Sequence, residues 1–221
     1  MAFPLIPVVI IILVFLAGSA AAVVLWPQLK GKRLLLTGAT SSGKTTLSDF
    51  LATGVIPARY VRTTATTTKK PNGGVKLKDL SLKVDKIWDP PGDREAWGAW
   101  LGKAKQADVI LYLIDYSRRH DDGYVQMVRR DTGQIAFWRK QGDLRKGTAI
   151  VLVVTHCDAQ ADFTPIGDAA QSEARQSAPA QQALRALGAG TPLVAGSLKT
   201  GDHAGALAFK ILEALRGGER G

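Results

Sequence analysis

The sequence has little cysteine and no charged residue before Lys30. With Cys157 as its one cysteine, the chain holds no disulfide framework and no cysteine-rich metal site, and a reducing compartment suits it. It contains no visible internal repeat and no group of His, Cys and Asp residues at metal-ligand spacing. The charge that it does carry, a net +10, is confined to residues 30–221.

Composition narrows the class of protein. A hydrophobic content of 46% with 22% charged residues excludes a disordered chain. The roughly 190 residues after the uncharged N-terminus are enough for one domain with a sizeable core. A basic excess suits either nucleic acid or an anionic membrane surface, because both present phosphates. The N-terminal sequence favours the membrane, and we expect no direct contact with nucleic acid.

Residues 3–26 contain no ionisable side chain. At about 1.5 Å per residue, a helix of this length exceeds the roughly 30 Å hydrocarbon core of a bilayer. Lys30, Lys32 and Arg33 follow at once, and such basic residues favour the cytoplasmic side. The sequence therefore predicts a single-pass anchor in residues 1–29, with the N-terminus outside and a domain of residues 30–221 in the cytoplasm. The membrane is either a bacterial plasma membrane or the endoplasmic reticulum.

A cleaved signal peptide is the alternative interpretation of this segment. The small residues at 18–22 resemble a cleavage site. However, no basic residue precedes the apolar run, and the run is longer than the usual core of about 7–15 residues. We favour the anchor.

After Lys32, apolar runs of strand length alternate with helical patterns. Strands are expected at 33–38, at 109–115, at 149–155, at 192–196, and as an antiparallel pair within 75–88; helices are expected at 44–53, 93–106, 122–141, 169–188 and 204–216. Continuous rather than alternating apolar runs suit a sheet covered on both faces. The pattern predicts an α/β fold with a doubly wound, mostly parallel sheet and one antiparallel edge strand. Ligands are expected at the carboxyl ends of its strands, and residues 63–74 are expected to form a polar loop.

The first predicted strand leads into the sequence GATSSGKTT. Four residues match the pattern G-x-x-x-x-G-K-[ST]: Gly38, Gly43, Lys44 and Thr45. The backbone N–H groups of such a loop, here including Ser41 and Ser42, curl around a phosphate, and the lysine reaches the β- and γ-phosphates. The hydroxyl of Thr45 is placed to bind Mg²⁺. The loop predicts a bound nucleotide, but by itself it does not separate a GTPase from an ATPase or a nucleotide kinase.

Three later segments occur in the order that a GTPase requires. Asp89 lies three residues before Gly92, a spacing that lets a carboxylate hold Mg²⁺ through water while a backbone N–H contacts the γ-phosphate. Residues 155–158 end in Asp158, whose carboxylate can accept hydrogen bonds from guanine. Residues 196–200 can bring backbone donors to the guanine carbonyl. Each segment is weak evidence alone, and the ordered set is strong.

Together these motifs make residues 33–216 resemble the Ras-like GTPase superfamily. The single predicted anchor directly before the domain is similar to the family of signal recognition particle receptor beta subunits and their Arf-like relatives. The resemblance implies GTP or GDP with Mg²⁺ as ligands. It further implies roles for these residues: Thr46 near the α-phosphate; Thr45, Asp89 and a switch I threonine at Mg²⁺; Gly92 in switch II; Thr155, His156 and Asp158 at the base; and Ser197, Leu198 and Lys199 beside it. We take Thr64 as the switch I threonine, with Thr63 and Thr66 as alternatives.

The sequence departs from the family at two places. His156 stands where relatives carry a lysine packed over the purine, and Thr155 must tie this loop to the phosphate loop. Asp93 stands where many relatives carry a glutamine that orients the attacking water. Arg94 is a weak candidate for a catalytic residue, and we expect slow intrinsic hydrolysis.

The sequence therefore predicts a membrane-anchored guanine-nucleotide switch that recruits a cytoplasmic protein partner. A structural anchor that holds GTP permanently is the alternative, and a membrane-bound ATPase or nucleotide kinase is a third possibility. Five aromatic residues surround the predicted switch II and the helix that follows: Trp88, Trp97, Trp100, Tyr124 and Trp138. Core packing is their default interpretation, and a partner-binding surface is the other.

Overall fold

The computed structural model describes residues 32–57, 67–69, 75–77, 80–82, 86–89, 97–160, 163–164 and 168–217. Several residues singled out by the sequence lie outside these ranges: residues 3–26, Thr63, Thr64, Thr66, Gly92, Asp93 and Arg94. None of the helices in the described ranges has the length and apolar character needed to cross a membrane.

The main sheet has six strands in the order β2-β5-β1-β6-β7-β8. Its strands are β1 (Arg33–Gly38), β2 (Thr67–Lys69), β5 (Lys86–Asp89), β6 (Val109–Asp115), β7 (Ala149–Thr155) and β8 (Leu193–Ala195). All neighbours pair in parallel except β2, which lies antiparallel to β5 at one edge. The predicted mostly parallel sheet with one antiparallel edge strand is confirmed.

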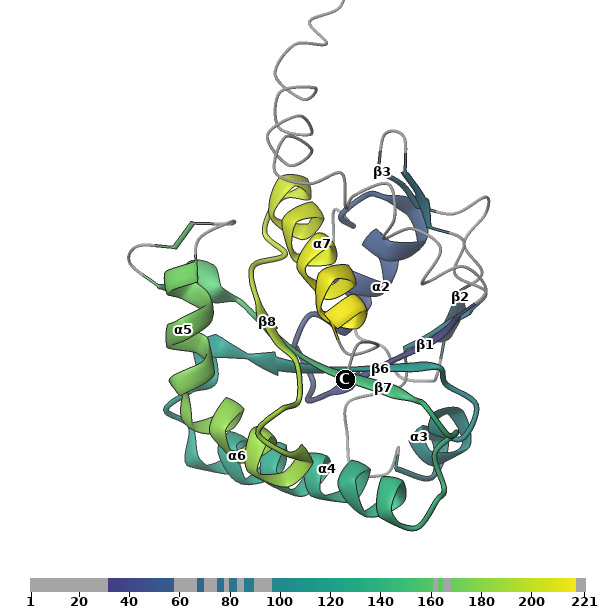
Figure 1. The fold of residues 1–221 in the computed structure, drawn as a ribbon. Coiled ribbons are helices and arrows are strands. Elements are labelled where there is room, and N and C mark those ends of the chain that lie inside the picture. The colour runs from purple at the N-terminus through teal and green to yellow at the C-terminus, as the bar shows by residue number, and fades with distance from the viewer. Residues whose placement is uncertain are drawn as a thin grey trace, which may run out of the picture.

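Helices cover both faces of this sheet, and this explains the continuous apolar runs. The described helices are α2 (Lys44–Thr53), α3 (Trp97–Ala104), α4 (Asp122–Lys140), α5 (Asp168–Gln176), α6 (Ala178–Leu187) and α7 (Gly201–Gly217). Helices α2 and α7 lie on one face, and α3, α4 and α6 lie on the other (Figure 1). Each layer has its own hydrophobic cluster, in which residues of β6 alternate: Leu111 and Leu113 belong to the first and Tyr112 and Ile114 to the second.

The antiparallel pair predicted within residues 75–88 is only partly correct. Strands β3 (Val75–Leu77) and β4 (Leu80–Leu82) do pair antiparallel, but they form a separate two-stranded sheet. The segment that follows, β5, instead pairs in parallel with β1 in the main sheet. The single apolar stretch therefore divides between two sheets.

The loop predicted at 63–74 is wrong at its centre. Residues 67–69 form β2, which pairs with β5 through Thr67 and Asp89. Its threonines are exposed, and an edge strand with a solvated face needs no apolar residues. The sequence signal for this strand is therefore the β-branched threonine run, not hydrophobicity.

The helix predicted at 169–188 is two helices, α5 and α6, which are separated at Ser177. Pro179 stands in the first turn of α6, where its missing N–H costs nothing, whereas inside a continuous helix its ring would clash with the preceding turn. Most of the other predicted helices agree with the structure within a few residues, and in the described ranges the helix predicted at 93–106 spans Trp97–Ala104.

The aromatic residues around α3 and α4 belong to the core. Trp88, Trp100, Tyr124 and Trp138 are buried within the cluster beneath α3, α4 and α6. Their default interpretation as core is confirmed, and the side chain of Trp97 lies outside the described part of the chain.

Strand register brings the carboxyl ends of the central strands to one edge of the sheet. Gly38 pairs with Leu113, Asp115 with Thr155, and Val154 with Ala195. The loops that follow β1, β6, β7 and β8 therefore meet there. We call this edge the carboxyl edge, and the opposite edge, where these strands begin, the basal edge.

Candidate functional site

The loop between β1 and α2 has the backbone of an anion cradle. Ser41 (φ 67°) and Gly43 (φ 85°) adopt left-handed conformations, which turn successive peptide N–H groups toward one side. Gly38 is required for a different reason: a Cβ there would lie 2.3 Å from the carbonyl oxygen of Leu113. Glycine at this position therefore lets β1 approach β6 closely as the loop begins.

Lys44 supplies the positive charge of this loop. Its side chain is only 7% exposed, and Nζ donates to the carbonyl oxygen of Ala39 at 2.7 Å. The hydroxyl of Ser42 donates to the same oxygen at 2.8 Å. Thr45 and Thr46 follow in the first turn of α2, where the helix N-terminus adds partial positive charge. The arrangement gives the loop the donors and the cation that a phosphate needs.

Thr155, the last residue of β7, ties the loop after this strand to the phosphate loop. Its Oγ1 donates to the carbonyl oxygen of Ser42 at 2.9 Å and lies 3.2 Å from the carbonyl oxygen of Ile114. The contact that the sequence requires of Thr155 is therefore present. The buried hydroxyl of Thr155 in β7 therefore contacts both β6 and the phosphate loop.

The loop after β8 also contacts the phosphate loop. A Cβ on Gly43 would lie 2.7 Å from Cδ1 of Leu198, so the leucine packs directly on the glycine backbone. Gly43 therefore meets two requirements, a left-handed φ and space for Leu198. The candidate base-binding segment and the candidate phosphate-binding segment form one continuous site.

Asp158 and Ser197 are joined across the β7 and β8 loops. Ser197 Oγ donates to Asp158 Oδ1 at 2.6 Å and accepts from the backbone N–H of Lys199 at 3.1 Å. Lys199 Nζ lies 4.0 Å from Asp158 Oδ2, with a side chain that is 70% exposed. The serine fixes the orientation of the carboxylate while the lysine stays largely in solvent.

His156 stands between these loops in a left-handed conformation, with φ 57°. Its Nδ1 lies 3.3 Å from Asp115 Oδ1 and 3.1 Å from Thr155 Oγ1. The hydrogen bond to Asp115 raises the pKa of His156 and outweighs the opposing effect of burial. Burial would raise the pKa of Asp115, but hydrogen bonds from His156 and Ser117 hold it below its ordinary value.

Asp115 is a site residue that the sequence reasoning missed. It ends β6, accepts from the backbone N–H and the hydroxyl of Ser117, and is buried beside His156. Its own N–H donates to the hydroxyl of Tyr124 at 2.6 Å. The signal was available, because an aspartate closes an otherwise apolar strand at the edge where ligands are expected.

Cys157 is a packing residue. It is fully buried, and burial raises the pKa of its thiol to about 12. A thiol in this state is largely protonated at neutral pH and is a poor nucleophile.

The expected Mg²⁺ ligands come from separate elements. Thr45 lies in the first turn of α2, and Asp89 ends β5 two residues below the end of β1 in the register. Thr64 lies outside the described residues. Within the described ranges, no three His, Cys, Asp or Glu side chains are grouped to hold a metal ion. Phosphate oxygens of a nucleotide are among the oxygen ligands that Mg²⁺ ordinarily takes in proteins.

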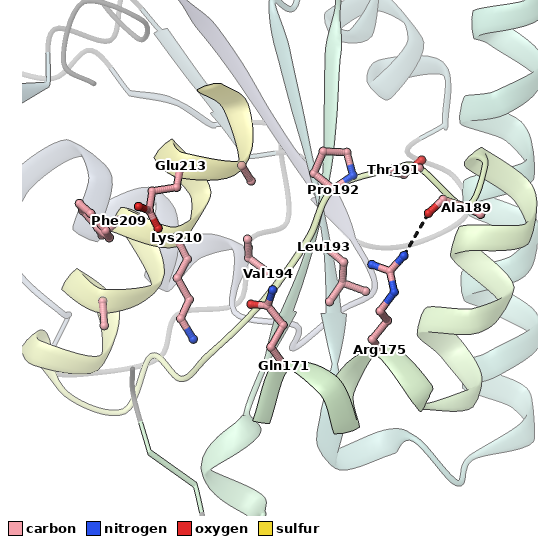
Figure 2. A pocket seen from close by; sticks show the side chains of 13 residues that line it. Gln171, Arg175, Ala189, Thr191, Pro192, Leu193, Val194, Phe209, Lys210 and Glu213 are labelled. Atoms are coloured by element: carbon pink, nitrogen blue, oxygen red, sulfur yellow. Dashed lines mark hydrogen bonds between the residues drawn. The ribbon is translucent and has the colours of Figure 1, made fainter. Parts of the chain in front are cut away.

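The hollow drawn in Figure 2 lies away from this site. It has a volume of about 530 Å³ and separates α5 from α7 along the edge strand β8. Arg175 on one side donates to the carbonyl oxygen of Ala189, and Lys210 on the other donates to that of Ala195. Both cations thus contact the backbone of their own domain, and the hollow contains none of the residues of the phosphate loop.

No protein-family model and no curated protein matches the sequence. Solved structures do match the fold. The Arl6 BBS3 small GTPase from Trypanosoma brucei, solved with the nucleotide analogue GppNp, superposes with a TM-score of 0.57 at 17% identity, covering 85% of this chain and 99% of that one. A bacterial selenocysteine-specific elongation factor, EF-Sec, superposes with a TM-score of 0.56 at 16% identity, covering 85% of this chain but 29% of that longer one. The chain therefore has a Ras-like P-loop GTPase fold.

Proposed function

We propose that this protein is a membrane-anchored guanine-nucleotide switch. One observation carries the proposal. At the carboxyl edge of the sheet, a phosphate-binding loop with a buried lysine lies in the same site as a carboxylate of fixed orientation. The cradle holds Lys44 at Ala39, and Asp158 is fixed by Ser197. The bridges from Thr155 and Leu198 hold these two parts in one site. A triphosphate at the cradle and a base at Asp158 fit this arrangement.

The finer assignments follow from the residues that the motifs supply. Asp158 reads guanine, with Ser197, Leu198 and Lys199 beside the base and His156 packed over it. Thr45, Asp89 and Thr64 complete the Mg²⁺ site with phosphate oxygens, and Gly92 contacts the γ-phosphate. Residues 3–26 anchor the chain, and the nucleotide state controls the binding of a cytoplasmic protein partner, as expected of a protein similar to signal recognition particle receptor beta subunits.

The nucleotide that copurifies with the full chain from mild detergent tests the proposal most directly. Extraction and chromatography of the released nucleotide identify it. GTP supports a docking subunit, GDP supports a cycling switch, and ATP would exclude both.

Asp158→Asn tests the base reader. An amide accepts through one atom only and presents an NH₂ group to the donors of guanine, so GTP affinity falls at least about tenfold. A xanthosine nucleotide carries an acceptor there and regains affinity in the variant. Asp122→Asn, in the first turn of α4, is the matched control and leaves both affinities unchanged. Equal losses for the two nucleotides in Asp158→Asn would exclude this role for Asp158.

Single-turnover hydrolysis separates a cycling switch from a permanent anchor. Asp93 stands where a water-orienting glutamine is often found, and its charge opposes that of the γ-phosphate. The full chain should therefore hydrolyse GTP at or below roughly 10⁻⁴ per second without a partner. A partner that supplies an arginine or glutamine should raise the rate. A rate near roughly one per second in the isolated chain would mean that it has a catalytic residue of its own, and Arg94→Ala would then be the first variant to measure.

A further inference from the structure

In the part of the domain that the structure describes, positive charge is concentrated at the basal edge. The described charged residues in the segments that lead into β1, β5, β6 and β7, and at the end of α4, are Lys32, Arg33, Lys86, Lys105, Asp108, Arg139, Lys140, Asp143, Arg145 and Lys146. We call this set the basal patch. It holds eight cations and two anions, and the register that pairs Arg33 with Lys86 and Val109 with Ala149 places its segments side by side.

The two anions of the basal patch are already neutralised. Asp108 is bound by both Arg33 and Arg145, and Asp143 lies 3.1 Å from Lys105. Among the described residues, no carboxylate lies within ion-pair distance of the other five cations: Lys32, Lys86, Arg139, Lys140 and Lys146. Lys32 and Arg139 line one hollow of about 540 Å³, although they are far apart in the sequence. Counted over the described residues alone, the patch therefore presents a cluster of five cations without a carboxylate partner.

The carboxyl edge has a different balance. Its described strand ends, loops and helix starts carry four cations, Lys44, Arg118, Arg119 and Lys199, against seven carboxylates, Asp89, Asp115, Asp121, Asp122, Asp158, Asp168 and Asp202. Among the described residues, the charge is thus distributed unevenly along the strand direction, with the positive excess at the end remote from the candidate nucleotide site. This uneven charge would attract an anionic surface to the basal edge rather than to the carboxyl edge.

Exposed apolar side chains lie toward the same end. The large hydrophobic residues exposed in the described ranges are Val55, 65% exposed just after α2, and Phe137, 52% exposed in the last turn of α4. Both helices run from the carboxyl edge to the basal edge, because each follows a strand that ends at the carboxyl edge. Aromatic and aliphatic side chains among cations suit the boundary between lipid headgroups and acyl chains, whereas a nucleic acid backbone has no use for them.

The sequence limits how far this patch can stand from a bilayer. The apolar run ends at Trp26, six residues before Lys32, which spans at most about 20 Å even when fully extended. We propose that the basal patch binds the anionic surface of the membrane in which residues 3–26 are anchored, and so holds the domain with its carboxyl edge turned toward the cytoplasm. This inference rests on the anchor of the proposed function.

The two ends of α4 provide matched probe positions for the test. Gln141 follows α4 at the basal edge, and His120 precedes it at the carboxyl edge; both are exposed, and the helix between them is about 28 Å long. Gln141→Cys and His120→Cys are labelled with a fluorophore in the full chain, and buried Cys157 stays unlabelled. Each protein is placed in nanodiscs of phosphatidylcholine alone or enriched in phosphatidylserine, with a headgroup-quencher lipid.

We expect anionic lipid to increase quenching at Gln141→Cys and not at His120→Cys, and about 0.5 M salt to remove the increase. In the Gln141→Cys background, Lys140→Glu weakens the lipid-dependent contact roughly fivefold, whereas the control Arg129→Glu, exposed in the middle of α4, does not. Equal quenching in both kinds of disc, or stronger quenching at His120→Cys, would overturn the inference. A response of the Gln141→Cys probe to an RNA oligonucleotide but not to phosphatidylserine would assign the patch to nucleic acid instead.

Failure of the anchor is recognised separately, because the protein would then leave discs of phosphatidylcholine during gel filtration. In that case the inference is tested by whether the protein floats with phosphatidylserine vesicles in a density gradient. Binding to phosphatidylserine vesicles that is lost in Lys140→Glu supports the patch without the anchor, and no binding to them overturns it.

Discussion

His156 and Asp115 form a charge pair at the point where the β6 and β7 loops meet. A lysine at position 156 would stay charged throughout the neutral range, whereas a histidine loses its charge there. The 3.3 Å contact with a buried carboxylate stabilises the charged ring. The substitution of histidine for lysine therefore makes the packing of this site dependent on pH.

The direction of this dependence follows from the two pKa shifts. His156 has a pKa raised above its ordinary 6.5, so its contribution to stability is complete below that value and is lost as pH rises through the raised pKa. Asp115 has a pKa lowered below 3.8, so its contribution is present above 3.8 and is lost as pH falls through the lowered pKa. The pair stabilises the fold most between these limits.

We predict that the free energy of unfolding and the nucleotide affinity of the full chain decrease together above the raised pKa of His156. His156→Gln removes this part of the pH dependence, while His120→Gln, at an exposed position before α4, retains it. Urea unfolding and nucleotide titration between about pH 6 and pH 9 measure both quantities. If wild type and His156→Gln differ by the same free energy at every pH, the charge pair contributes nothing.

Single residues of the site differed in how well the sequence revealed them. The motif spacing identified Lys44 and Thr155 because each is fixed relative to a glycine loop or a strand end. Asp115 was not identified although it ends an apolar strand, because it matches no motif spacing and its contact with His156 joins two separate loops. Pairings between distant loops depend on sheet register, which a single sequence does not state.

At the scale of elements, the predictable strands were those buried on both faces. β1, β6 and β7 were predicted with their observed bounds because nothing polar interrupts them before the carboxyl edge. β2 was missed because a three-residue strand with exposed threonines lacks a hydrophobic signal. The division between β4 and β5 was missed because one apolar stretch supplies strands to two sheets, and the sequence does not mark the break. The break between α5 and α6 had a signal in Pro179, and the helical periodicity on either side concealed it.

An added methyl group should change the free energy of unfolding in opposite directions at two glycines of regular elements. Gly133 lies inside α4, where a Cβ would meet no other part of the molecule within 4 Å, so Gly133→Ala should raise the free energy of unfolding by about 0.5–1 kcal/mol. Gly38→Ala should destabilise strongly, because the methyl group would meet the rigid backbone of Leu113 at a φ of 132°. Urea unfolding followed by tryptophan fluorescence measures both. Equal effects of the two substitutions would contradict the packing described at Gly38.

At the scale of the whole molecule, the sheet separates two surfaces of different character. In the described ranges, the carboxyl edge carries the candidate nucleotide site with no excess of positive charge. The basal edge carries clustered cations, of which Lys32 follows the N-terminal apolar run by six residues in the sequence. A domain held by its basal edge leaves its carboxyl edge accessible to a soluble partner. The arrangement is therefore consistent with a switch that operates close to a membrane.

The anchor itself gives the last prediction. Residues 3–26 should stay with the mature chain and hold it in the membrane fraction through carbonate extraction, because no charged side chain interrupts the run. Ile11→Arg with Val14→Arg places two charges near the centre of the span, at about 2.5–3.5 kcal/mol each, and should release much of the protein. Gln28→Arg adds a charge beyond the run and should leave it bound. Extraction of the unaltered chain by carbonate, or a mature N-terminus near Ala22, would show that the segment is not an anchor.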